Sequence, residues 1–123
     1  MHAIKAVEDS YAGFGEAYFS TVEKGAVKGW KRHNRMTLNL VVPVGAVEFI
    51  VHDPQATAEE ERFRSFTIGA TDDYARLTVP PGLWMAFSGR ADGLNLVLNV
   101  ANIGHDPDEV DRAELDAFSW TFA

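Results

Sequence analysis

The sequence contains no cysteine. Disulfide bonds, thiol nucleophiles and thiolate metal sites are therefore excluded. It also lacks a hydrophobic run of membrane-spanning length, and its first residues, MHAIKAVEDS, are too charged for a signal peptide. We therefore expect a cytoplasmic protein that neither crosses nor enters a membrane.

Basic residues are scarce, since 11 Lys and Arg are set against 18 Asp and Glu, and the formal net charge is −7. Nucleic-acid binding needs a broad basic surface to neutralise phosphates, so this class of function is disfavoured. One stretch, residues 28–44, departs from the acidic average. Its sequence is KGWKRHNRMTLNLVVPV, and its basic residues are Lys28, Lys31, Arg32, His33 and Arg35. A local basic cluster in an acidic protein favours a small anionic ligand.

The composition and the pattern of the sequence predict a globular β protein. A chain of 123 residues with 46% hydrophobic content predicts one domain, residues 1–123, with a true core. Short segments rich in β-branched and aromatic residues are separated by turn signals, which indicates a sandwich or barrel. We expect strands at 16–22, 38–44, 46–51, 63–68, 75–79, 83–87 and 94–101.

Two polar segments fall between or after these strands. Residues 55–62, QATAEEER, predict a hairpin loop or a single helical turn. Asp106 and Pro107 predict the start of a short helix, because Asp caps helices and Pro is tolerated in the first turn. Asp108, Glu109 and Asp111 would then lie near its positive end.

The basic stretch contains a Lys-x-His pair, Lys31 and His33. If this segment is extended, both side chains point to the same face and can meet one ligand. The alternative is that both lie on a solvent-exposed face. The spacing alone does not decide between them.

The wider pattern resembles the cupin family. Gly25, five residues, Lys31-x-His33 and a later Gly45 resemble the first cupin signature, and residues 80–85, PPGLWM, resemble the second. Within the cupins, the chain is similar to relatives of dTDP-4-dehydrorhamnose 3,5-epimerase. The similarity extends from about Gly15 to Arg112 and includes GEAYFSTVEKGAVKGW, TVPPGLWMAF and LVLNVANIGHDPDEVDR.

This resemblance implies an all-β, double-stranded β-helix (jelly-roll barrel) with a short C-terminal helix or turn. It also implies a pocket inside the barrel, a homodimer and nucleotide-sugar substrates. Metal-binding cupins use three His and one Glu, and the corresponding residues here are Lys31, His33, Leu38 and Met85. Of these, only His33 has a side chain suited to bind a divalent metal, and one ligand does not hold it. We therefore expect neither a metal nor another cofactor. His105 is expected in a loop.

The related epimerases use a His base and a Tyr acid. The resemblance places Lys31 at the base, Met85 at a second pocket His, Leu38 near a pocket Lys, and Asn102 or Ile103 near the Tyr. The catalytic set is therefore altered.

Two hypotheses follow. In the first, the protein is an epimerase or isomerase of a keto-deoxysugar nucleotide. Lys31 then acts as base or enolate stabiliser and His33 as the second proton-transfer group. In the second, the barrel binds a sugar nucleotide or another anion without turnover. Lys28 is expected to meet the diphosphate, with Arg32, Arg35 or Arg76 nearby.

The predicted substrate-binding residues are Lys28, Trp30, Arg35, Asn39, Arg76, Met85 and Asn99. Trp30 and Trp84 are expected near the pocket mouth, where either indole can stack on a base or a sugar ring. The alternative for both indoles is packing in a core or an interface. The same alternative applies to Leu38 and Met85.

Overall fold

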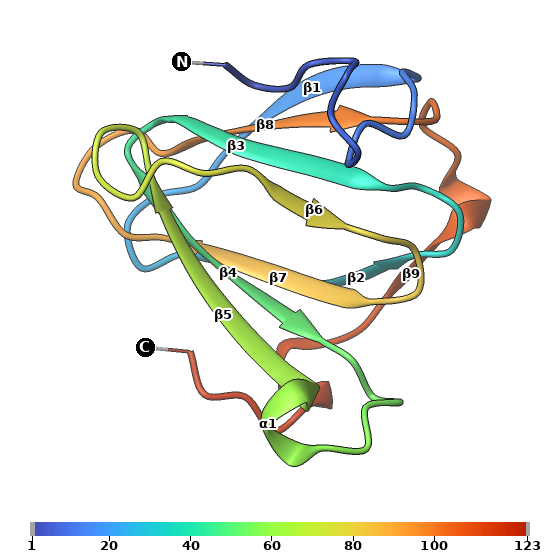
Figure 1. Cartoon of the computed structure of the whole chain (residues 1–123). Helices are drawn as coiled ribbons and strands as arrows, with labels where there is room; N and C mark the ends of the chain where they lie inside the picture. Colours follow the sequence, from blue (N-terminus) through green and yellow to red (C-terminus); the bar gives the residue numbers. More distant parts are fainter. Residues whose placement is uncertain (1, 123) are drawn as a thin grey trace.

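The structure is a computed structural model that describes residues 2–122. Its strands form two antiparallel sheets that face each other (Figure 1). The four-stranded sheet has the order β1-β8-β3-β6, and the five-stranded sheet has the order β5-β4-β7-β2-β9. The strands are β1 Glu16–Thr21, β2 Val27–His33, β3 Leu38–Val44, β4 Ala46–His52, β5 Phe63–Gly69, β6 Leu77–Val79, β7 Trp84–Gly89, β8 Leu96–Ala101 and β9 Val110–Arg112.

The three helical elements are each a single turn. They are α1 Glu59–Arg62, η1 Pro107–Glu109 and η2 Leu115–Ala117. The expected turn in residues 55–62 and the expected Asp106 cap are both confirmed. The Asp106 carboxylate accepts the Asp108 amide at 3.0 Å. The helix after Asp106 was expected to include Asp111, but Asp111 lies in β9, which was not predicted.

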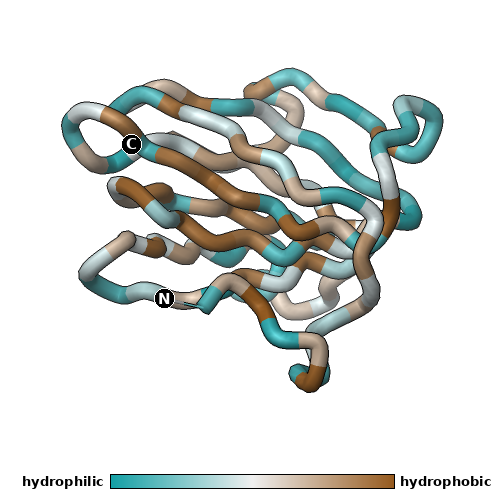
Figure 2. The backbone as a smooth tube through the Cα atoms, turned by 90° about the horizontal axis from the view of Figure 1, so that it is seen from above, coloured by the Kyte–Doolittle hydropathy of each residue, from teal (hydrophilic) through white to brown (hydrophobic). Residues whose placement is uncertain are grey.

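Alternation along the strands divides the hydrophobic residues between two cores. Val47 and Phe49 of β4 point between the sheets, whereas Ile50 points to the outer side of the five-stranded sheet. Residues 113–122 cover that outer side with Phe118, Trp120 and Phe122. In Figure 2, hydrophobic colour follows the central strands, and the peripheral loops are largely hydrophilic.

Asn95 explains why β8 starts at Leu96 and not at Leu94 as expected. Its buried side chain accepts the amides of Ala46 and Ala91 at 2.9 and 3.2 Å, and donates to the carbonyl oxygens of Val22 and Ala91, each at 3.0 Å. The Asn95 side chain thus joins three loops. Gly45, with φ +81°, passes so close that an added Cβ would lie 2.3 Å from the Asn95 Oδ1 atom.

Candidate active site

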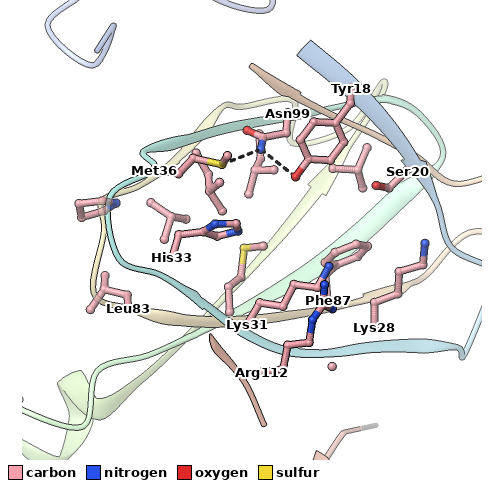
Figure 3. Close-up of a pocket in the computed structure, with 17 residues that line it drawn as sticks. Tyr18, Ser20, Lys28, Lys31, His33, Met36, Leu83, Phe87, Asn99 and Arg112 are labelled. Carbon is pink, nitrogen blue, oxygen red and sulfur yellow. Dashed lines mark hydrogen bonds between the residues drawn. The ribbon is translucent and has the colours of Figure 1, made fainter. Parts of the chain in front are cut away.

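A cavity of about 340 Å³ opens between the two sheets. One end is apolar, with Met36, Leu38, Val79, Leu83 and Met85 in its wall, and the other end carries the cations Lys28, Lys31 and Arg112. Figure 3 shows His33 near the apolar end, and Tyr18 and Asn99 across the cavity from the cations. The cavity therefore offers a charged end and an apolar end to one ligand.

Strand β2 supplies three polar side chains to this cavity. Lys31 and His33 are two residues apart and line the same wall, as expected for an extended strand. Lys28 lines it as well, although it is three residues from Lys31. The register with β7 shifts between Lys28 and Lys31, and this irregularity turns the Lys28 side chain toward the cavity.

His33 forms a short hydrogen bond with a buried carboxylate. The His33 Nδ1 atom is 2.5 Å from the Glu109 Oε1 atom. The exposed fractions of the two side chains are 16% and 2%. With Nδ1 donating to Glu109, the neutral imidazole presents Nε2 as a proton acceptor.

Glu109 is fixed independently of His33. Its Oε2 atom accepts the backbone amides of Asn34, Arg35 and Met36 at 3.1, 3.0 and 3.2 Å. Burial alone would raise the pKa of Glu109. The hydrogen bonds from His33 and from the amides outweigh burial and lower that pKa below its usual value. Glu109 is therefore a carboxylate near neutral pH, and it orients the imidazole.

In the described part of the chain, no carboxylate lines the cationic end of the cavity. Lys31 is paired in register with Arg112 of β9. Among residues 2–122, neither side chain has a hydrogen-bond or ion-pair partner, and the same is true of Lys28. Partial burial, followed by the positive charges of Arg112 and Lys28, lowers the pKa of Lys31. Three cations without anions around one cavity favour an anionic ligand.

Tyr18 brings a hydroxyl group to the cavity from the opposite sheet. Its Oη atom accepts a hydrogen bond from the Asn99 Nδ2 atom at 3.2 Å. The phenolic proton is thus free for another acceptor. Because Tyr18 comes from β1 and His33 from β2, a ring bound between the sheets would meet the two groups on different sides.

Similarity to solved structures places the fold. A dTDP sugar isomerase from Desulfovibrio desulfuricans G20 superposes with a TM-score of 0.86 at 36% sequence identity, covering 94% of this chain and 74% of that chain. The chain belongs to the RmlC-like cupin family. No family model matches the sequence, and no curated protein matches it.

More distant structures share the RmlC-like fold. ChmJ, a 3′-monoepimerase from Streptomyces bikiniensis in complex with dTDP-quinovose, gives a TM-score of 0.74 at 18% identity, covering 88% of this chain and 58% of that chain. A second structure is a mutant of the 3,4-ketoisomerase QdtA from Thermoanaerobacterium thermosaccharolyticum in complex with TDP-4-keto-6-deoxyglucose. It gives a TM-score of 0.67 at 19% identity, covering 81% of this chain and 67% of that chain. The cupin jelly roll expected from the sequence is confirmed.

Of the residues predicted to bind substrate, Lys28, Met85 and Asn99 line the RmlC-like cavity, and Trp30 does not. Trp30 is 1% exposed and packs on the outer side of the five-stranded sheet, 5.2 Å from the Phe118 ring between centroids. Trp84 lies in the same outer cluster. Trp30 and Lys31 are neighbours on one strand, so their side chains take opposite faces.

Arg35, Asn39 and Arg76 also lie outside the cavity. Arg35 is exposed and pairs with Asp106 at 2.7 Å. Arg76 is 2.7 Å from the Glu8 carboxylate. The Asn39 amide donates to the Ser10 carbonyl oxygen at 3.2 Å. These contacts attach loops and the N-terminal segment to the barrel, so we leave these three residues out of the proposed site.

Tyr18 and Arg112 line the cavity, and Glu109 holds His33 without lining it, but none of the three was predicted as a site residue. Alternation in EAYFST puts Tyr18 on the same face as Ser20, and this signal was available. Glu109 and Arg112 carried no such signal. Glu109 was expected in a short helix, and Arg112 was not assigned to any element. The pairing of β9 with β2 brings Arg112 to the cavity and Glu109 to His33.

The cavity does not fit the metal of the metal-binding cupins. Lys31 offers an ammonium group, Leu38 no ligand atom and Met85 only a thioether. Of these four positions, His33 alone offers a nitrogen ligand, because Glu109 holds Nδ1 and leaves Nε2 free. Within residues 2–122, no group of three His, Asp or Glu side chains is arranged to hold a metal ion. Within the same residues, no helix is long and apolar enough to span a membrane.

Proposed function

We propose that this protein is a metal-independent isomerase or epimerase of a keto-deoxysugar nucleotide, and that it removes a proton from a carbon next to the ketone. The observation that carries the proposal is the hydrogen bond between His33, which lines the cavity, and the buried Glu109. Glu109 holds Nδ1, so Nε2 of His33 is the base that meets the substrate. The family's solved members named above, which include a dTDP sugar isomerase and an epimerase, support the same class of substrate.

The cationic end would bind the diphosphate. Lys28, Lys31 and Arg112 surround this end, and within residues 2–122 none of them has a carboxylate partner. A diphosphate there leaves the sugar pointing toward the apolar end, where His33 lies. Met36, Leu83 and Met85 would surround the sugar and exclude water from the reacting carbon.

Tyr18 would be the second proton-transfer group. The resemblance placed the family's Tyr near Asn102 or Ile103, and neither of these residues lines the cavity. The Tyr18 hydroxyl, held by Asn99, faces His33 from the other sheet. Proton removal by His33 and return by Tyr18 would invert a carbon, whereas return by His33 would not.

The test is proton exchange followed by NMR in deuterium oxide, with dTDP-, GDP- and UDP-linked 4-keto sugars as probes. The proton next to the ketone should exchange in the presence of the wild-type protein. His33→Ala should lower the exchange rate by about a hundredfold to ten-thousandfold, the usual contribution of a proton-transfer group. Lys28→Ala should instead weaken binding. Arg35→Ala removes a nearby cation outside the cavity, so it should change neither the exchange rate nor the binding of the sugar nucleotide.

The second candidate function is binding without turnover. It is favoured by the altered set Lys31, Leu38 and Met85, which stand where the resemblance expects two His and a Lys. In the same experiment, saturable binding with no exchange for every sugar would support this candidate and contradict the first.

A further inference from the structure

We propose that Lys31 acts as a covalent catalyst, by forming an imine between its Nζ atom and the ketone carbon of the sugar. This inference rests on the proposed function, because it assigns a step to the same site. Lys31 lines the cavity wall two residues before His33. The amine and the base therefore reach one sugar ring from the same strand.

The amine is available for attack on a carbonyl. No carboxylate pairs with Lys31 among residues 2–122, and the nearby Glu109 is fully engaged by His33 and three amides. Partial burial and the charges of Arg112 and Lys28 lower the pKa of Lys31, which raises the fraction of neutral amine. Desolvation and a neighbouring cation are the two causes that activate nucleophilic lysines in general.

The step balances without any added reactant. The Nζ lone pair attacks the ketone carbon, the C=O π pair moves to oxygen, and a proton passes from nitrogen to that oxygen. The hydroxyl group then takes up a proton from solvent and leaves as water, which gives a protonated imine. His33 Nε2 removes a proton from the adjacent carbon, and the C–H electron pair flows toward the iminium nitrogen to give an enamine. Protonation at carbon and addition of water release the product ketone and the free amine.

The charges around Lys31 suit both stages of this step. In the free protein, Arg112 and Lys28 favour the neutral amine. When a diphosphate binds at these two cations, its negative charge offsets them and favours the cationic imine. Lys31 is only partly buried, so water can leave and return. The imine supplies the electron sink that Leu38 and Met85 cannot.

Reductive trapping tests the proposal. The wild-type protein is incubated with dTDP-4-keto-6-deoxyglucose and cyanoborohydride, and its mass is then measured intact and by peptide. The expected product is one adduct on Lys31, with the added mass of the sugar nucleotide less one oxygen atom. Lys31→Arg keeps the charge and should lose the adduct. Lys24→Arg is the matched control, because Lys24 lies outside the cavity and pairs with Asp92, and this variant should keep the adduct.

A second measurement needs no variant. Imine formation and hydrolysis replace the ketone oxygen by solvent oxygen, so an ¹⁸O-labelled ketone should lose its label faster with the wild-type protein than without it. Label loss at the protein-free rate would overturn the imine, as would trapping on a residue other than Lys31.

The outcomes separate this inference from the proposed function. Proton exchange without trapping or label loss would leave the isomerase standing and overturn the imine. Trapping at Lys31 without proton exchange would support the reactive amine and contradict the isomerase.

Discussion

Glu109 is the residue on which the geometry of the site depends most. Its carboxylate accepts hydrogen bonds from one imidazole and three backbone amides, and these contacts fix the chain from His33 to Met36. A carboxylate in this position both orients the base and stabilises the turn after β2. Catalysis and stability should therefore be linked through this one side chain.

We expect Glu109→Gln to lower the free energy of unfolding by about 1–3 kcal/mol at neutral pH, the usual cost of impairing buried hydrogen bonds to a charged group. The pKa of Glu109 is lower in the folded state, so its stabilising effect is complete above its unfolded value, about 4.3. The effect is lost as the pH falls through the folded value. The difference between wild type and variant should therefore shrink in acid.

Urea unfolding at a series of pH values measures this difference. Asp108→Asn is the matched control, because Asp108 is an exposed neighbour in the same turn. A constant difference between wild type and Glu109→Gln across the acidic range would contradict the assignment. Proton exchange should also fall in Glu109→Gln, with dTDP binding unchanged.

At the scale of the element, β2 separates catalysis from packing by its two faces. Lys31 and His33 line the cavity, whereas Trp30 and Arg32 point to the outer side, where the Arg32 guanidinium lies 4.8 Å from the Trp84 ring centroid. Trp30 also donates from Nε1 to the Leu115 carbonyl oxygen at 3.3 Å. The outer face thus attaches the C-terminal residues to the sheet.

Trp30→Ala should accordingly lower the free energy of unfolding by about 3–5 kcal/mol, as for other large aromatic residues removed from a core. The folded variant should bind dTDP as the wild type does. Trp30→Phe keeps part of the packing, and it replaces the alanine variant in both measurements if that variant does not fold. Calorimetric titration and urea unfolding measure the two quantities. Weaker dTDP binding with unchanged stability would instead support stacking of Trp30 on the ligand.

The same strand shows how far the sequence could go. Alternation and a β-rich pattern are local properties, so the jelly roll and the common face of Lys31 and His33 could be predicted. The sequence could not predict which face of the strand points into the cavity. Trp30 was therefore predicted to contact the ligand, although it lies on the outer face. The Glu109 contact joins residues 76 apart in the chain. It depends on the pairing of β9 with β2, which no local pattern in residues 106–112 indicates.

At the scale of the molecule, the N-terminal segment contacts the outer face of β3 through Ser10 and Asn39, but the four-stranded sheet keeps an exposed edge at β1. Within residues 2–122, strand β1 pairs only with β8, so it is one of the two edge strands of that sheet. Because Tyr18 and Ser20 point inward, Phe19 points outward, where it is 64% exposed. Leu98 lies opposite Phe19 in register. An apolar face next to an open edge is usually covered by another chain.

We therefore expect a homodimer formed through β1, because a twofold axis lets the same edge and the same apolar face cover each other. Phe19→Glu should shift the protein toward monomer, since it places a charge in the centre of that contact. Phe14→Glu is the matched control, because Phe14 is equally exposed but precedes the strand. Light scattering at micromolar concentration measures the mass. A single species of 13.6 kDa for the wild type would contradict the dimer, and a Phe19→Glu protein that stays dimeric would place the contact elsewhere.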